Sequence, residues 1–258
     1  MQMRKETKLA ISTAKKAGLM LKKHFGRYYV VKHKNKHDIL LDVDVQADRL
    51  IRKELSKSGL PMITEESQHK SKAGSFWVVD PLDGSINFGN RIKDFAVSIA
   101  LVEEGLITTG VIFIPEADEL YHAEQERGAF MNNLKMHVSK KTRLSEAILS
   151  MTLSSVKHRR EKELEIMRCI GERVINIRSN GSSAVSCSML ARGAFDCYLT
   201  VEPHFWDYAA GSLLIREAGG LVTDFEGREY CEDSRSLVIG NSSLHKQLRG
   251  MIKGLQVF

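Results

Sequence analysis

The chain has 258 residues, 43% of them hydrophobic and 27% charged, so it is long enough to bury a substantial core in one large domain or two smaller ones. No window reaches the roughly 18 uninterrupted apolar residues that a membrane span needs, and the first residues lack the apolar core of a secretory signal, so we expect a cytoplasmic protein without a membrane anchor. The formal net charge of +6 suits nucleic acid, an anionic membrane surface or a small anionic substrate, and charge alone does not separate these partners.

The first sixty residues predict two helices. Apolar residues recur at helical spacing over 4–24, and Gly26 ends that pattern. A second apolar stripe follows Asp44 and is closed by Gly59. This spacing predicts Asp44 as the N-cap or a first-turn residue of the second helix.

The middle of the chain predicts strands joined by tight turns. Turn-prone glycine or asparagine residues separate several of them, which favours antiparallel hairpins over a strictly alternating parallel sheet. The predicted strands are 61–63, 75–79, 95–103, 106–114, 119–123 and 135–138.

After about residue 140, helices mix with shorter strands. No internal repeat, low-complexity segment or Pro/Ser linker divides the chain. The pattern predicts an α+β protein in which an N-terminal half, 1–140, packs directly on a C-terminal half, 141–258. The predicted strands of the second half are 147–152, 195–200, 221–225 and 236–240, and its helices are 159–171, 182–192, 207–218 and 243–255.

Acidic residues stand at the ends of these elements, namely Asp44, Glu65, Glu66, Asp80, Asp83 and Asp207. A carboxylate at an element's end projects away from the core, and converging carboxylates repel one another unless cations lie between them. Oxygen ligands without histidine or cysteine select a hard ion, and Mg²⁺ is the commonest choice for handling phosphate. The four cysteines form no CxxC pair, so neither a zinc site nor a redox dithiol is predicted.

The turn after Asp83 supplies the other half of a phosphate site. If residues 85–88 open a helical turn, the backbone amides there point at an incoming anion, and Gly84 permits its close approach. The Ser85 hydroxyl both donates and accepts, so it can orient a water for attack on phosphorus. A type I turn with side-chain capping is the alternative interpretation of "DPLDGS" taken alone.

Three motifs in order, "TEES" (64–67), "DPLDGSINF" (80–88) and "WDYAAG" (206–211), resemble those of the inositol monophosphatase family of Mg²⁺-dependent, lithium-sensitive phosphatases. The similarity of order and spacing runs from about residue 33 to 220. It implies the layered α-β-α-β-α sandwich of the inositol monophosphatase and fructose-1,6-bisphosphatase superfamily, and a homodimer.

The resemblance also implies roles for single residues. Glu65, Asp80 and the Leu82 carbonyl would bind a first Mg²⁺, and Asp80, Asp83 and Asp207 a second. Glu65 would help to hold a third ion, while Ser85, in place of a threonine, would hydrogen-bond Asp44 and orient the attacking water. Substrate contacts would come from Asp83, Gly84, Ser85, Gly181, Ser182, Ser183, Thr200, Glu202 and Asp207.

Some positions depart from the family pattern. Thr200 stands where inositol-cleaving members carry a substrate-binding glutamate, and Glu202 is the nearest acid, on the same face if the strand continues. Thr64 replaces a glycine, so a positive φ there would strain the backbone beside Glu65. Ser183 replaces an alanine in the "GSSA" segment, and a helix N-cap is a compatible role for this segment.

We therefore predict a Mg²⁺-dependent phosphomonoesterase with an inositol 1-phosphate-like monophosphate as its first substrate. Fructose 1,6-bisphosphate, 3′-phosphoadenosine 5′-phosphate and histidinol phosphate are alternatives on the same fold. Two stretches are rich in basic residues, 30–38 in a predicted loop and 156–163 on a predicted helix. The second is expected to be a solvated helix face, and an RNA-binding or regulatory module that uses it is the alternative outside enzymology.

Overall fold

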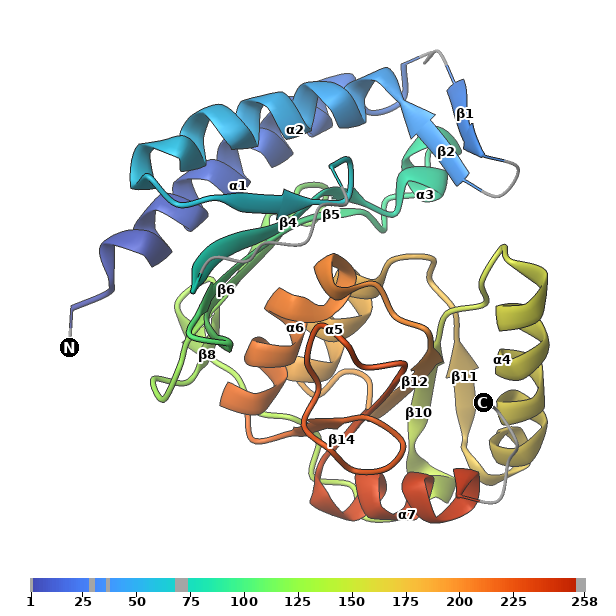
Figure 1. Ribbon diagram of the computed structural model, residues 1–258. Helices are drawn as coiled ribbons and strands as arrows, with labels where there is room; N and C mark the ends of the chain where they lie inside the picture. The colour runs from blue at the N-terminus through green and yellow to red at the C-terminus, as the bar shows by residue number, and fades with distance from the viewer. Residues whose placement is uncertain (1, 28–30, 36–37, 68–73, 254–258) are drawn as a thin grey trace.

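The computed structural model describes the whole chain except residues 1, 28–30, 36–37, 68–73 and 254–258, and describes 31–35 and 38–41 by their backbone alone. Helices and sheets alternate in layers (Figure 1). The helices are α1 (Lys5–His24), α2 (Asp42–Leu55), α3 (Ser85–Gly89), α4 (Lys157–Ile170), α5 (Ser183–Ala191), α6 (Phe205–Glu217) and α7 (Ser242–Ile252), with short 3₁₀ turns η1 (Ser56–Ser58), η2 (Leu144–Glu146) and η3 (Gly171–Arg173).

A seven-stranded sheet follows the first two helices, with the strand order β3-β4-β5-β6-β7-β8-β9. Every neighbouring pair is antiparallel except β3 and β4, so the prediction of antiparallel hairpins is confirmed. The strands are β3 (Met62–Thr64), β4 (Ser75–Asp83), β5 (Ala96–Glu103), β6 (Leu106–Ile114), β7 (Glu119–Glu124), β8 (Ala129–Met131) and β9 (Leu134–Lys135).

A five-stranded sheet forms in the second half, with the order β11-β10-β12-β14-β13. Here β10 pairs in parallel with both β11 and β12, and the remaining pairs are antiparallel. The strands are β10 (Ile148–Met151), β11 (Asn176–Arg178), β12 (Cys197–Val201), β13 (Leu221–Thr223) and β14 (Ser236–Gly240).

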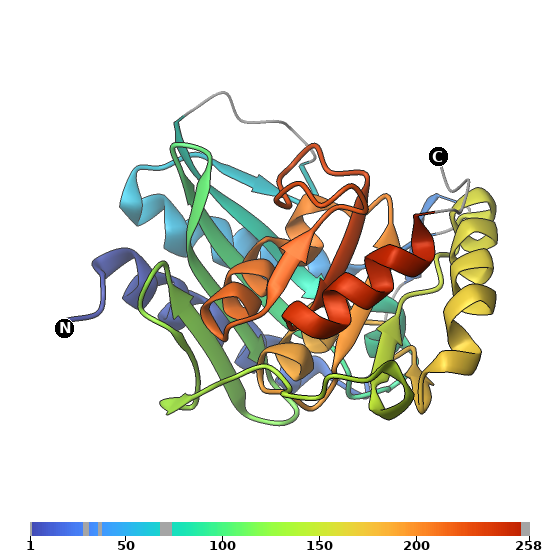
Figure 2. The same cartoon turned by 90° about the horizontal axis from the view of Figure 1, so that it is seen from below.

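The layers run α1/α2, first sheet, α5/α6, second sheet, α4/α7 (Figures 1 and 2). Three buried apolar clusters lie between them. One joins α1 and α2 to the first sheet, one joins α5 and α6 to both sheets, and one joins α4 and α7 to the outer face of the second sheet. The α-β-α-β-α sandwich implied by the resemblance is confirmed. The division at residue 140 stays a prediction, and α6 from the second half packs against the first sheet.

Two predictions about local structure were wrong, and strand β11 (Asn176–Arg178) was missed. The strand predicted over 135–138 ends at Lys135, because the Val138 amide donates to the Ala218 carbonyl (3.0 Å) and carries the chain to the next layer. The loop predicted over 30–38 contains strand β1 (Val31–Asn35), which pairs with β2 (Asp38–Leu41). Strand β11 was not predicted, because its three residues are largely exposed and show no apolar alternation.

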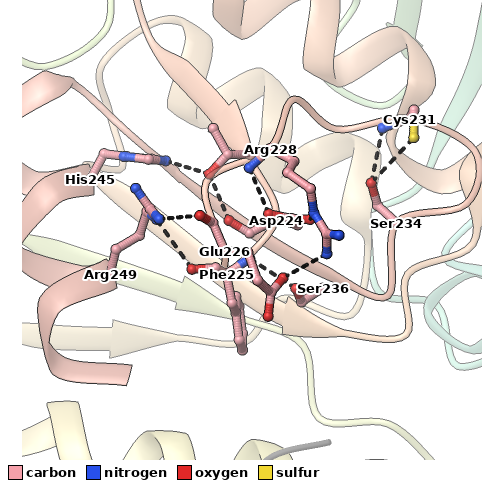
Figure 3. A network of polar contacts seen from close by, with 10 residues as sticks. Asp224, Phe225, Glu226, Arg228, Cys231, Ser234, Ser236, His245 and Arg249 are labelled. Atoms are coloured by element: carbon pink, nitrogen blue, oxygen red, sulfur yellow. Dashed lines mark hydrogen bonds and ion pairs between the residues drawn. The ribbon is translucent and has the colours of Figure 1, made fainter. Parts of the chain in front are cut away.

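The loop after β13 is held in place by polar contacts with α7 and β14 (Figure 3). The Arg228 guanidinium donates to the Asp224 carboxylate (2.6 Å), and the Phe225 amide donates to the Ser236 hydroxyl (2.9 Å). Arg249 of α7 donates to the Phe225 carbonyl (3.2 Å). The loop therefore carries Tyr230 in a fixed position against α6, where its ring packs with those of Phe205 and Tyr208.

Among the described residues no helix is long and apolar enough to cross a bilayer.

Candidate active site

A bulge in β4 places its two aspartates together. In a regular strand, residues three apart point to opposite faces of the sheet. Here Asp80 pairs with Ser98 and Asp83 with Ala96, so three steps along β4 oppose two along β5. The extra residue restores a common side for Asp80 and Asp83, and Pro81, which has no amide hydrogen, is tolerated at such a bulge.

The Asp80 carboxyl lies at the centre of the acidic cluster. Its residue is 2% exposed, and its Oδ1 accepts a hydrogen bond from the Leu82 amide (3.1 Å). Burial raises the pKa of Asp80 well above its ordinary value, and the charges of Glu65, Asp83 and Asp207 raise it further. The structure therefore brings the four predicted metal-ligating carboxylates into electrostatic contact, from β4, α6 and the segment after β3.

Asp83 is tied to the N-terminus of α5. Its carboxylate accepts bonds from the Ser182 hydroxyl, the Ser183 amide (3.3 Å) and the Ala184 amide (2.7 Å). Burial raises the pKa of Asp83, and these three donors act in the opposite direction. Ser182 is also the N-cap of α5, because its Oγ accepts from the Val185 amide (3.1 Å), so the predicted capping role is confirmed.

The turn after Asp83 has the predicted helical form. Gly84 adopts a left-handed conformation (φ 87°), and the first α3 bond runs from the Phe88 amide to the Gly84 carbonyl (2.9 Å). The amides of the first turn are thus left available to an anion. Asn87, to which we assigned no role, donates to the Asp94 carbonyl (2.6 Å) and the Asn180 carbonyl (2.7 Å), so it joins α3 to the segment before α5.

Thr64 is not strained. It lies in β3, fully buried, and is not among the residues with positive φ. Its hydroxyl accepts a bond from Arg52 of α2 (2.6 Å), and Arg52 also pairs with Asp48 (2.6 Å). The threonine thus links α2 to the segment that carries Glu65, and the concern about the backbone there is removed.

Asp44 and Ser85 stand on α2 and α3. Asp44 is 5% exposed and lies in the first turn of its helix, as predicted. Ser85 is half-buried at the start of α3, and its hydrogen bond to Asp44 stays a prediction.

Asp207 lies in the first turn of α6, beside α5. The two helices approach closely, because a Cβ on Gly211 would lie 2.4 Å from the Cβ of Cys187. Burial raises the pKa of the Cys187 thiol, and the charges of Asp83 and Asp207 both contribute. Asp83 and Asp207 therefore both lie close enough to the buried Cys187 thiol to affect its pKa.

Thr200 faces a buried carboxyl that the sequence analysis did not identify. Thr200 is 1% exposed on β12, and its Oγ1 donates to Glu163 Oε1 (3.4 Å). Glu163 comes from α4, is fully buried, and accepts the Ser154 amide on Oε2 (2.6 Å). Glu163 lies in a stretch that also reads as a charged surface helix, so only the tertiary structure reveals its burial.

Glu202 is held away from Thr200. Strand β12 ends at Val201, and Glu202 has a positive φ (49°), so strand alternation does not extend to it. Its carboxylate pairs with His158 (3.0 Å) and Lys162 (2.9 Å) of α4. A substrate contact by Glu202 stays a prediction, and these two partners compete with it.

The basic stretch 156–163 is largely exposed, as expected of a solvated helix face, and several of its side chains bond to other parts of the chain. Arg159 donates to the Val201 carbonyl (3.3 Å), Arg160 donates to the Ser154 carbonyl (2.6 Å), and Lys162 pairs with Glu202. RNA binding through this stretch stays an untested prediction. The side chains of 30–38 lie outside the described residues.

We expect Glu163→Gln to stabilise the protein at alkaline pH. Burial raises the pKa of Glu163 above its ordinary value of 4.5, so the ionised carboxylate opposes folding. The protonated Glu163 carboxyl stabilises the folded state. This contribution is fully present below the ordinary pKa and is lost as the pH rises through the raised pKa of the folded protein. Thermal melts should show the variant about 2–4 °C above wild type at pH 8, with the difference shrinking toward pH 5.

Glu161→Gln is the matched control for this prediction, because Glu161 lies on the same helix with a side chain that is 64% exposed. Its melting temperature should follow that of wild type at every pH. A Glu163→Gln protein that is less stable than wild type at pH 8 would show that the ionised carboxylate supports the fold.

The chemistry of the acidic cluster fits a hard cation. All its donors are carboxylate oxygens, and a cation between them would relieve the repulsion that raises the pKa of Asp80. Over the described part of the chain, no three Asp, Glu, His or Cys side chains stand as a closed ligand set.

Carboxylates that converge at strand and helix ends, beside the first-turn amides of α3, suit the hydrolysis of a phosphate monoester. The chain belongs to the inositol monophosphatase family, whose model matches residues 2–255. It is a phosphatase of that family, which acts on small phosphorylated substrates.

Named relatives span almost the whole chain. An inositol-1-monophosphatase of Rhizobium meliloti is 38% identical over 245 residues, 92% of each chain. A fructose-1,6-bisphosphatase/inositol-1-monophosphatase of Thermotoga maritima is 33% identical over 242 residues, 93% of this chain and 92% of that one. The crystal structure of the extragenic suppressor protein suhB from Bartonella henselae has a TM-score of 0.91 at 33% identity, covering 96% of this chain and 98% of that one.

Proposed function

We propose that this protein is a Mg²⁺-dependent phosphomonoesterase that hydrolyses a small phosphorylated polyol, with an inositol 1-phosphate-like monophosphate as the first candidate. The observation that carries the proposal is the buried Asp80 carboxyl, crowded by the charges of Glu65, Asp83 and Asp207. Membership of the family and the relative named inositol-1-monophosphatase support the substrate class.

Two or three Mg²⁺ ions would be held by Glu65, Asp80, the Leu82 carbonyl, Asp83 and Asp207. Bound there, Mg²⁺ supplies positive charge to the phosphoryl group and lowers the pKa of the attacking water. Direct attack by water requires no covalent enzyme intermediate. Lithium sensitivity, a homodimer and a cytoplasmic location are further proposals of the same kind.

The chain's own groups would orient the reactants. The first-turn amides of α3 would face the phosphate, and Ser85 and Asp44 would position the attacking water and take its proton. Gly181, Ser182 and Ser183 stand at the N-terminus of α5, next to Asp83, where they would contact the alcohol part of the substrate. A substrate contact by Thr200 is a further proposal, and its buried hydroxyl would have to leave Glu163 to make it.

A bisphosphate is the second candidate. A relative with 33% identity is named for both fructose-1,6-bisphosphatase and inositol-1-monophosphatase activity, and the net charge of +6 suits a more anionic substrate. The charge argument applies equally to 3′-phosphoadenosine 5′-phosphate, which also carries two phosphates, while histidinol phosphate has no specific observation in its favour.

Phosphate release tests the proposal. The substrates are inositol 1-phosphate, fructose 1,6-bisphosphate, 3′-phosphoadenosine 5′-phosphate and histidinol phosphate, each with Mg²⁺ and with a chelator. We expect release from inositol 1-phosphate that the chelator abolishes. Release that persists in chelator would contradict the metal dependence, and strict preference for another substrate would replace the inositol assignment.

A further inference from the structure

Four buried or half-buried hydroxyls form a continuous chain behind the acidic cluster. The Ser183 hydroxyl donates to the Tyr208 hydroxyl (3.0 Å), which lies 2.7 Å from the Tyr198 hydroxyl. Tyr198 in turn lies 2.6 Å from the Thr152 hydroxyl. With Ser183 as the first donor, each hydroxyl can donate a hydrogen bond to the next one. All three bonds are then formed with the donors running in one direction.

The chain joins four separate elements. Ser183 opens α5, Tyr208 lies in α6, Tyr198 in β12, and Thr152 directly after β10. Tyr198 and Tyr208 are 0% and 2% exposed. A buried phenol is more stable in its neutral form, which both donates and accepts a hydrogen bond.

Each partner of the Ser183–Tyr208 bond is linked to a carboxylate of the cluster. The Ser183 amide donates to Asp83, and Tyr208 directly follows Asp207 in the chain. The bond between the Ser183 and Tyr208 hydroxyls therefore connects the segment that holds Asp83 to the turn that carries Asp207. Like charges on these two carboxylates push them apart, and the hydroxyl chain opposes that movement.

We propose that the chain Ser183–Tyr208–Tyr198–Thr152 is a positioning device that sets the spacing of Asp83 and Asp207 and thereby the affinity of the site for its second metal ion. The inference rests on the proposed metal-dependent function. Groups that orient metal ligands commonly control affinity without touching the ion. Tyr198 is the informative member, because it contacts neither carboxylate and lies in the middle of the chain.

Tyr198→Phe tests the proposal, since it removes two links and leaves the ring in place. Mn²⁺ serves as the probe, because it accepts the same oxygen ligands as Mg²⁺ and is counted by electron paramagnetic resonance. We expect the dissociation constant of the weaker Mn²⁺ site to rise about tenfold, with kcat at saturating metal within about twofold of wild type.

Tyr121→Phe is the matched control. Tyr121 is also fully buried and loses one hydroxyl bond, to Glu119 (2.5 Å), on the first sheet. Both variants are expected to lower the melting temperature slightly, but only Tyr198→Phe should weaken Mn²⁺ binding. Thr152→Val should weaken it in the same direction, and the double variant Tyr198→Phe with Thr152→Val should lose no more than Tyr198→Phe alone, because the two substitutions break one shared link.

Two results would overturn the proposal in distinguishable ways. Unchanged Mn²⁺ affinity in Tyr198→Phe, with normal binding by wild type, would reject the positioning role and leave the phosphatase proposal intact. Failure of wild type to bind Mn²⁺ or Mg²⁺ would reject both.

Discussion

Asp80→Asn is expected to abolish turnover while making the metal-free protein more stable. Asp80 is buried among three other acids, and it is the proposed ligand shared by two ions. The amide removes that charge, so we expect Mg²⁺-dependent phosphate release to fall by about a thousandfold or more. In chelator the melting temperature should rise by about 2–4 °C, because the substitution removes repulsion that no cation compensates.

Asp196→Asn separates this effect from the loss of any buried carboxylate. Asp196 is 3% exposed and accepts bonds from Lys141 (2.9 Å) and the Ile148 amide (2.6 Å), so its charge is paired. Its amide variant should be less stable than wild type and retain turnover. An Asp80→Asn protein that keeps near-normal turnover, or that melts lower in chelator, would contradict the role assigned to the acidic cluster.

The layers of the fold could be predicted because most elements carry strong local signals. Helices such as α1 and α2 bury regular apolar stripes, and strands β4 to β7 are long and bounded by turns. The missed elements are short, and their pairing depends on strands that are distant in the sequence. Strand β11 exists because β10 lies beside it, and residues 136–138 leave the sheet because Ala218 accepts the Val138 amide.

The acidic cluster was predictable in composition but not in geometry. The motifs indicated which carboxylates belong together, while the β4 bulge that turns Asp80 and Asp83 to one side becomes visible only in the register with β5. The burial of Glu163 could not be predicted either, because its helix has the sequence pattern of a charged surface helix. For Tyr198 the strand pattern indicates burial, but it does not indicate a hydrogen-bond partner. Polar groups that meet across elements leave no periodic signal in either segment.

Gly84→Ala is expected to lower both stability and turnover, because the position combines two separate requirements for glycine. Its φ of 87° is costly for any residue with a side chain, by about 1 kcal/mol. A Cβ there would also lie 2.8 Å from the Asp94 carbonyl oxygen, which is backbone and accepts the Asn87 side chain. The residue 94 segment must then move, so we expect a total loss of about 2–4 kcal/mol in the free energy of unfolding.

Displacement of this segment should also reach the chemistry. Gly84 separates Asp83 from the first-turn amides of α3, and an error of about 1 Å in such a site costs about a hundredfold in turnover. Gly59→Ala is the matched control, because Gly59 has a similar φ (74°) but nothing within 4 Å of its Cβ position. Both variants are unfolded in denaturant and their losses in the free energy of unfolding are compared. The conformational cost of the positive φ is common to both, so the difference between them is the cost of the contact with Asp94. If Gly84→Ala loses no more stability than Gly59→Ala and keeps full turnover, the close approach of Asp94 does not govern the shape of the phosphate-binding turn.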